Sequence, residues 1–203
     1  MSRSPVTTRI ASIADVPALT ALWKELGQVG GRAERAINPA TIQDIGERLA
    51  ATIAAPDCRV VLACTGGDPV GMAVLRSMRP DPMSENRVVQ LMHVIVAGGH
   101  RRRGVGHALV AAAAEFADER AIEHLTAGVY PSLRDASRFY ARLGFAPMLV
   151  QRVAGVAAVR RRLGTEMIGT VRVEDAVRRR SRLRRAVPPQ RYAARVTEPL
   201  DRP

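Results

Sequence analysis

Residues 91–106, LMHVIVAGGHRRRGVG, decide the fold of this chain. The apolar run from Leu91 to Val96 predicts a buried strand, and the Gly-Gly pair after it predicts a turn. Beyond Gly104 and Gly106, apolar residues recur at helical spacing, so these glycines open a helix. A strand that leads through glycines to a helix N-terminus gathers unpaired backbone N–H groups, and the helix dipole favours an anion there. The stretch therefore predicts a turn that holds a pyrophosphate.

Two common phosphate-binding motifs do not fit this turn. A Walker A loop needs a lysine after its last glycine, and the only lysine of the chain is Lys24. A dinucleotide-binding fingerprint continues G-x-G-x-x-G, whereas here Gly104 and Gly106 are followed by Leu109. A P-loop is thereby excluded, and the dinucleotide fingerprint lacks its third glycine.

A second motif lies at residues 131–145, PSLRDASRFYARLGF. Its apolar residues share one helical face, at Ala136, Phe139, Tyr140 and Leu143. Ser132 followed by Asp135 predicts a capping box at the start of this helix, and Gly144 predicts a left-handed residue just after its end.

Together the two motifs resemble the GNAT acyltransferase superfamily. The first matches its R-x-x-G-x-G turn through Arg101, Gly104 and Gly106 after a strand that closes at Val96, and the second matches its A-x-x-[FL]-Y-x-x-L-G-F helix. The resemblance covers roughly residues 6–150. It implies an α/β fold with a GNAT-like mixed central sheet, flanking helices and an acyl-CoA co-substrate, which we expect to be acetyl-CoA.

The resemblance also implies where the coenzyme binds. The cofactor-binding residues would be Val94, Ile95, Val96, Arg101, Arg102, Arg103, Gly104, Val105, Gly106 and His107. A strand amide near Val94 or Ile95 would donate to the oxyanion, and Tyr140 would return a proton to the leaving thiolate. The ordinary pKa of tyrosine, about 10, keeps this phenol protonated at neutral pH.

A general base is harder to assign, because neither Met92 nor His93 is acidic, although relatives often carry an acid there. His93 has an ordinary pKa suited to deprotonating an ammonium group, so we expect it to be the second catalytic residue. Asp81 and Glu85 stay open as alternatives. No Cys/His cluster has metal-binding spacing, so we expect no metal.

The pattern around these motifs alternates between strands and helices. We expect strands at Val6–Ile10, Arg59–Ala63, Val70–Leu75, Val88–Val96 and Leu125–Val129. We expect helices from Asp15, as N-cap, to Gly27, from about Thr41 to Ile53, and from about Gly104 to Arg120. The loops 27–38 and 80–87 would line the acceptor site.

The composition suits one domain with an extension. We assign residues 1–155 to a GNAT-like domain and 156–203 to an Arg-rich extension. No apolar stretch is long enough to span a membrane, and the N-terminus lacks the apolar core of a signal peptide. Cys58 and Cys64 fall in one strand, about 20 Å apart, too far for a disulfide. We therefore expect a cytoplasmic protein.

The C-terminal extension carries most of the positive charge. Residues 160–203 contain 13 arginines against 5 acids, a net +8 of the total +12. Three interpretations stay open: a solvated tail, a segment that binds nucleic acid or another polyanion, and a segment that packs on a second subunit of a homodimer. Tyr192 is the only stacking ring in it, which disfavours specific single-strand RNA recognition.

These patterns predict an acetyl-CoA-dependent N-acetyltransferase that acts on a primary amine. A small amine is the first expectation for the acceptor, and a protein N-terminus or lysine the second. From a different class, the alternative is a CoA-binding regulatory or nucleic-acid-associated protein that keeps the fold with weak catalysis.

Overall fold

The computed structural model describes residues 4–26, 42–130 and 132–164. The described residues of the first of its two compact units form five strands and four helices, with two short 3₁₀ turns. Their order is β1 (Val6–Ile10), η1 (Ile13–Asp15), α1 (Val16–Leu26), α3 (Ile42–Ala54), β2 (Cys58–Thr65), β3 (Asp68–Met78), β4 (Val88–Val96), η2 (Gly98–His100), α4 (Val105–Asp118), β5 (Leu125–Ala127) and α5 (Arg134–Arg142).

The strands form one mixed sheet, as predicted, and their order within it is β1-β2-β3-β4-β5. β1 to β4 pair with one another in antiparallel fashion, and β5 is parallel to β4. β2 and β3 run further than expected and close on a two-residue turn, because Gly66 and Gly67 both adopt positive φ, 62° and 94°. That geometry is the one that a tight hairpin needs. β5 is shorter than expected and ends at Ala127 rather than Val129.

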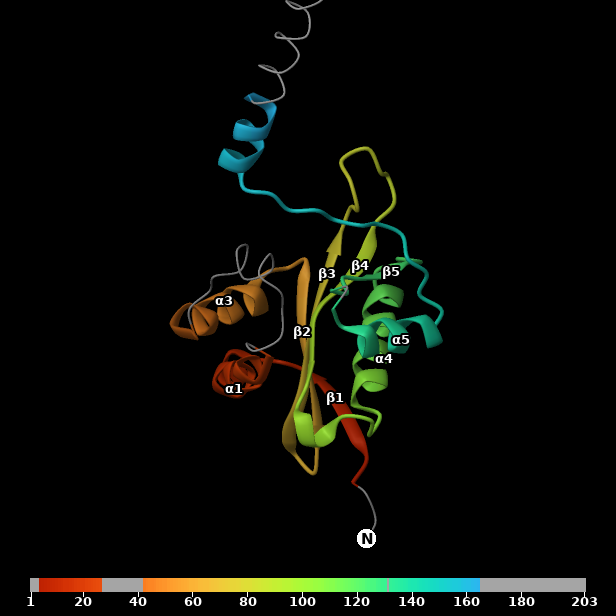
Figure 1. The fold of residues 1–203 in the computed structure, drawn as a ribbon. Helices are drawn as coiled ribbons and strands as arrows, with labels where there is room; N and C mark the ends of the chain where they lie inside the picture. The colour runs from red at the N-terminus through yellow and green to blue at the C-terminus, as the bar shows by residue number, and fades with distance from the viewer. Residues whose placement is uncertain (1–3, 27–41, 131, 165–203) are drawn as a thin grey trace, which may run out of the picture. The chain divides into compact units, whose positions relative to one another are not determined.

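Helices cover both faces of the sheet (Figure 1). On one face, α4 contributes Leu109, Ala113 and Phe116 to a core that also contains Leu75 and Leu91. On the other face, the buried residues come from α1, α3 and the opposite sides of the strands, at Leu19, Leu22, Ile45, Leu49, Leu62 and Met72. The aliphatic side chains of both cores are almost fully buried, which gives the site a rigid base.

Two predicted caps are wrong. The turn before α1 begins at Ser12, not at Asp15, because the Asp15 carboxylate accepts hydrogen bonds from the Ser12 amide at 2.7 Å and from Arg9 at 2.7 and 2.6 Å. α5 begins after Leu133, with no side-chain cap, so Ser132 and Asp135 form no capping box. Asp135 instead lies 3.5 Å from Arg138.

β4 is interrupted at His93, which has a φ of 49°. Met92 pairs with Val74 and Ile95 pairs with Met72, so His93 and Val94 oppose the single residue Ala73. This arrangement is a β-bulge. It resets the alternation of the strand, so that Val94 packs with the α4 face and Ile95 with the α1 face.

Residues 149–203 form the second compact unit. Within it, the structure describes a helix over 156–164, whose Val156, Val159 and Leu163 are exposed. The predicted boundary between residues 155 and 156 stays a prediction. The loop 27–38 and the tail beyond residue 164 lie outside the described residues, and so do the predictions made for them.

Candidate functional site

The turn between β4 and α4 has the strand, glycine and helix order that the sequence predicts. β4 ends at Val96, η2 follows, and α4 begins at Val105. The N-cap of α4 is Gly104, with φ 87° and ψ −8°, a left-handed conformation that side chains other than Gly, Asn and Asp rarely adopt. Glycine therefore suits the left-handed N-cap position through which the chain enters α4.

The first turn of α4 presents free backbone donors. Its first internal hydrogen bond runs from the Ala108 amide to the Gly104 carbonyl, at 3.0 Å. Within the described part of the chain, no acceptor is recorded for the amides of Val105, Gly106 and His107. Unpaired N–H groups at the positive end of a helix dipole are an arrangement that can hold an anion.

The side chains just before α4 give this turn a positive charge, which a bound anion would balance. Arg101, Arg102 and Arg103 are all exposed just before α4, and the first turn of the helix contains no acid. Positive side chains at the positive end of a helix are unfavourable. No carboxylate of the described residues pairs with any of the three.

Gly106 has a packing role that the sequence does not reveal. A Cβ at this position would lie 3.2 Å from the ring of Phe139 on α5, closer than such contacts normally are. His107 meets the same ring edge-on, with centroids 5.2 Å apart. The two motifs, far apart in sequence, are thus in direct contact, and α5 lies beside α4 (Figure 1).

β4 and β5 pair over only part of their length. The pairs are Val89 with Leu125, Gln90 with Thr126 and Leu91 with Ala127. β4 then continues to Val96, while β5 has ended. Beyond Leu91, the edge of β4 that faces β5 has no strand partner among the described residues, so backbone groups near Val94 and Ile95 are available to a ligand.

His93 lies at the bulge and contacts α1. Its ring centroid is 4.5 Å from that of Trp23, with the two rings inclined at 56°. The side chain reaches the surface, yet the protein packed around the imidazole removes enough water to lower its pKa below the ordinary value. His93 is therefore neutral at neutral pH and able to accept a proton.

Tyr140 is buried on α5, between Phe139 and Phe145, with ring centroids 5.2 Å away in each case. Burial raises the pKa of Tyr140 to about 12, so its hydroxyl stays protonated. None of the described residues is recorded as its hydrogen-bond partner, and no buried polar side-chain atom among them lacks a partner. The hydroxyl must therefore reach solvent, where it can donate a proton.

The structure brings some of the predicted site residues together and separates others. The turn residues and α5 are in contact through Phe139, whereas His93 faces Trp23 on the α1 side of the sheet. Trp23 and Phe139 were missed as site residues. Helical spacing places both on apolar faces, but it does not tell which strand or turn each face meets. Arg87 lies at the opposite end of β4 from the turn, where it binds Ser77.

The described residues lack two features that other sites and proteins have. No group of three or more His, Cys, Asp or Glu side chains is arranged to hold a metal ion there. In the same residues, no helix has the length and apolar character needed to span a bilayer.

Comparison of the sequence with protein families gives one match. The model of the Acetyltransferase (GNAT) family matches residues 23–145, which include both motifs and every predicted site residue. No protein of curated function matches the chain.

Solved structures share the fold at low sequence identity. A transcriptional regulator from Bacillus halodurans C-125 is 23% identical with a TM-score of 0.61, over 74% of this chain and 99% of its own. A ribosomal-protein-alanine N-acetyltransferase from Brucella melitensis biovar Abortus 2308 is 18% identical with a TM-score of 0.59, over 74% and 99%. An aminoglycoside N-acetyltransferase, AAC(6')-Iy, in complex with CoA is 16% identical with a TM-score of 0.63, over 75% and 95%.

Proposed function

Because the chain belongs to the GNAT acetyltransferase family, we propose that it transfers an acetyl group from acetyl-CoA to a primary amine. The observation that carries the proposal is the turn before α4. Three amides and three arginines that have no partner among the described residues meet there at the positive end of a helix, and a pyrophosphate supplies the missing negative charge.

The residues around the turn fit the coenzyme. Val105, Gly106 and His107 would hold the pyrophosphate through their amides, and Arg101, Arg102 and Arg103 would add charge. The pantetheine arm would lie along the free edge of β4, beside Val94, Ile95 and Val96, where β5 has ended. A molecule with backbone-like amides suits an unpaired strand edge.

Three groups of this chain would carry the acyl transfer. His93, neutral at the bulge, takes a proton from the acceptor ammonium, so that the amine can form its bond to the acyl carbon. The amide of Val94 or Ile95 donates to the oxyanion of the tetrahedral intermediate. As the carbon–sulfur bond breaks, Tyr140 gives its proton to the departing thiolate, and the second proton lost by the amide nitrogen restores the phenol through solvent. Asp81 and Glu85 stay the alternative bases.

A small amine is the acceptor that we favour, ahead of a protein N-terminus or lysine. Two exposed acids in the loop before β4, Asp81 and Glu85, suit a cationic substrate. Three of the similar structures, of two proteins, are aminoglycoside acetyltransferases, and that supports the choice. The two cysteines are free thiols, which agrees with a cytoplasmic enzyme.

The proposal is tested by turnover of acetyl-CoA on a panel of amines, with thiol release as the readout. The panel contains polyamines, aminoglycosides, amino sugars and peptides with a free N-terminus. Thiol release that depends on one class of amine supports the proposal. Hydrolysis at one rate whatever amine is present contradicts it.

Coenzyme binding is tested at Gly104 rather than at Gly106, where any side chain would press on Phe139. Nothing lies within 4 Å of a Cβ at Gly104, and Asp and Asn both tolerate its left-handed backbone. Gly104→Asp should abolish the rise in thermal midpoint that acetyl-CoA produces, because it adds negative charge where phosphate binds. Gly104→Asn, of the same shape without the charge, should keep most of the rise. Equal shifts in the two variants would refute the assignment.

The second candidate function is a CoA-binding regulatory or nucleic-acid-associated protein with weak catalysis. It is favoured by the absence of an acid at Met92 and His93 on β4. The experiments above separate the two candidates, since this one predicts the thermal shift with acetyl-CoA but no amine-dependent thiol release.

A further inference from the structure

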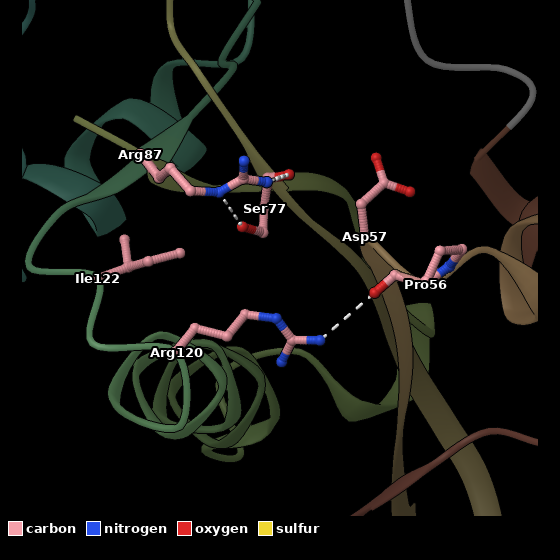
Figure 2. A pocket seen from close by; sticks show the side chains of 6 residues that line it. All are labelled: Pro56, Asp57, Ser77, Arg87, Arg120 and Ile122. Carbon is pink, nitrogen blue, oxygen red and sulfur yellow. Dashed lines mark hydrogen bonds between the residues drawn. The ribbon is translucent and has the colours of Figure 1, made fainter. Parts of the chain in front are cut away.

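A pocket of about 380 Å³ lies at the end of the sheet where β2 and β4 begin and β3 ends. It is lined by six residues from four segments: Pro56, Asp57, Ser77, Arg87, Arg120 and Ile122 (Figure 2). The full length of α4, 14 residues or about 20 Å, separates this end from the turn before Val105. The pocket is therefore distinct from the turn that we propose holds the pyrophosphate.

Arg87 extends into the pocket with its guanidinium fixed in place (Figure 2). Its Nε donates to the Ser77 hydroxyl at 3.1 Å, and one Nη donates to the Ser77 carbonyl at 2.8 Å. The remaining N–H groups of its guanidinium have no recorded partner among the described residues and can bind a ligand. No carboxylate in the described part of the chain pairs with Arg87.

Arg120 lines the same pocket from the segment after α4. Its guanidinium lies 3.8 Å from the ring centroid of the fully buried Phe116, and it donates to the Pro56 carbonyl at 3.4 Å. Stacking on a ring fixes the plane of a guanidinium while leaving its edge free for hydrogen bonds. Both arginines are thus held in position before any ligand arrives.

Ser77 adds a buried hydroxyl. The residue is only 3% exposed, and its oxygen accepts from Arg87, so the hydroxyl proton is left to donate. No acceptor for that proton is recorded among the described residues. A buried donor of this kind normally has a partner.

The charges around the pocket do not balance. Arg76 pairs with Asp57, and Arg59 pairs with Glu119, which also lies 3.8 Å from Arg120. Among the lining residues, two guanidinium groups, Arg87 and Arg120, therefore stand against the one carboxylate of Asp57, which Arg76 already pairs, and this leaves an excess of one positive charge.

We propose that this pocket is a second ligand site, which binds the carboxylate or phosphate group of a small molecule. Arg87 and Arg120 would bind the oxyanion from two sides through charged hydrogen bonds, and Ser77 would donate a third. Ile122 and Pro56 form the apolar wall against the rest of the ligand. The inference does not depend on acyl transfer.

The test is a thermal-shift titration of the full chain with succinate and with inorganic phosphate, at about 150 mM NaCl so that distant charges are screened. Both probes should raise the midpoint, and the larger effect tells which oxyanion the pocket prefers. Arg87→Gln and Arg120→Gln should each weaken the apparent affinity by about 10-fold or more, the scale of a lost charged hydrogen bond. Asp57→Asn should strengthen it by about 2- to 5-fold, because a repelling charge is removed.

Arg79→Gln is the matched control, since Arg79 is exposed and does not line the pocket. It should change the affinity for neither probe, and none of these variants should alter the shift that acetyl-CoA produces. The proposal is overturned if neither probe raises the midpoint, or if Arg79→Gln weakens binding as much as Arg120→Gln does. If Arg87→Gln fails to fold, Arg120→Gln and Asp57→Asn decide between the outcomes, because the proposal requires their effects on affinity to have opposite signs.

Discussion

At the scale of single residues, Tyr140 combines burial with an accessible hydroxyl. Tyr140→Phe should lower kcat by about 10- to 10⁴-fold while the thermal shift with acetyl-CoA stays nearly unchanged, because the phenol acts on the leaving thiolate and not on the bound coenzyme. Steady-state kinetics and thermal shift on the same preparation give both values.

Tyr130→Phe is the control for this change, since Tyr130 is 41% exposed and lies outside the motif. It should turn over like the parent. If Tyr140→Phe does so too, Tyr140 only packs between Phe139 and Phe145.

His93 gives a prediction for pH. Loss of water around the imidazole lowers the pKa of His93, so kcat/KM should rise with pH through a value below about 6.5 and level off above it. His93→Asn should remove that limb. Asparagine suits the test because it tolerates the positive φ of this bulge, where alanine would add strain.

The pH dependence of stability does not tell a base from a purely structural His93, whereas the pH dependence of the rate does. Its lowered pKa means that the unfolded chain binds the proton more readily, so native stability falls as pH drops below about 6.5, and His93→Asn should abolish that dependence in either case. Only a base also controls the rate. A pH–rate limb that survives in His93→Asn moves the role to Asp81 or Glu85.

The places of Gly104 and Tyr140 in the fold were predictable from the sequence, because each residue belongs to a motif. Their functional roles stay predictions. The bulge at His93 was not predictable, because the run from Leu91 to Val96 is apolar on both sides and gives no sign of a shifted register. The packing of Gly106 on Phe139 depends on a contact between distant segments, which local spacing does not encode.

At the scale of elements, the end of α5 shows how one glycine sets the direction of the chain. Gly144 has a φ of 88°, and the amides of Gly144 and Phe145 donate to the carbonyls of Ala141 and Tyr140, both at 3.1 Å. This is the Schellman arrangement, as the sequence predicts. Gly144→Ala should cost about 1–2 kcal/mol in urea unfolding, since alanine is strained in this conformation.

Gly128→Ala serves as the control, because Gly128 has no positive φ and a Cβ there would also meet open space. Its unfolding midpoint should stay near that of the parent. Equal losses in the two variants would mean that backbone strain is not the cause.

Strands and helices were predictable in order and type, since each carries the hydrophobic period of its class. β1 and β4 have the bounds that their apolar runs predict. Caps were predicted less well. Ser132 and Asp135 have the spacing of a capping box, but the helix begins at Arg134, between them.

At the scale of the whole molecule, the tail is removed without touching the proposed site. Truncation after Gly164 should leave kcat/KM and the thermal midpoint close to those of the full chain if the tail is solvated. If it binds a polyanion, retention on nucleic acid at low salt should be strong, should fall steeply as salt rises, and should disappear on truncation. Loss of coenzyme binding in the truncated chain would contradict both and indicate packing on the core or on a second subunit.

The sequence predicted the GNAT fold as a whole but not the pocket at its far end. Ser77, Arg87 and Arg120 come from three segments with no motif in common, and only the sheet and α4 bring them together. Charge composition alone gave no reason to separate these arginines from the others.

The early end of β5 has a consequence for local opening of the sheet. β4 and β5 share only three residue pairs, fewer than any other two paired strands of the sheet. Beyond Leu91, β4 is hydrogen-bonded to β3 on one edge and has no described strand on the other. In hydrogen–deuterium exchange, we expect β5 to open long before β1 to β3 do. A coenzyme bound along the free edge of β4 would take the place of a neighbouring strand. Amide exchange at residues 94–96 should therefore be slower with the coenzyme than without it.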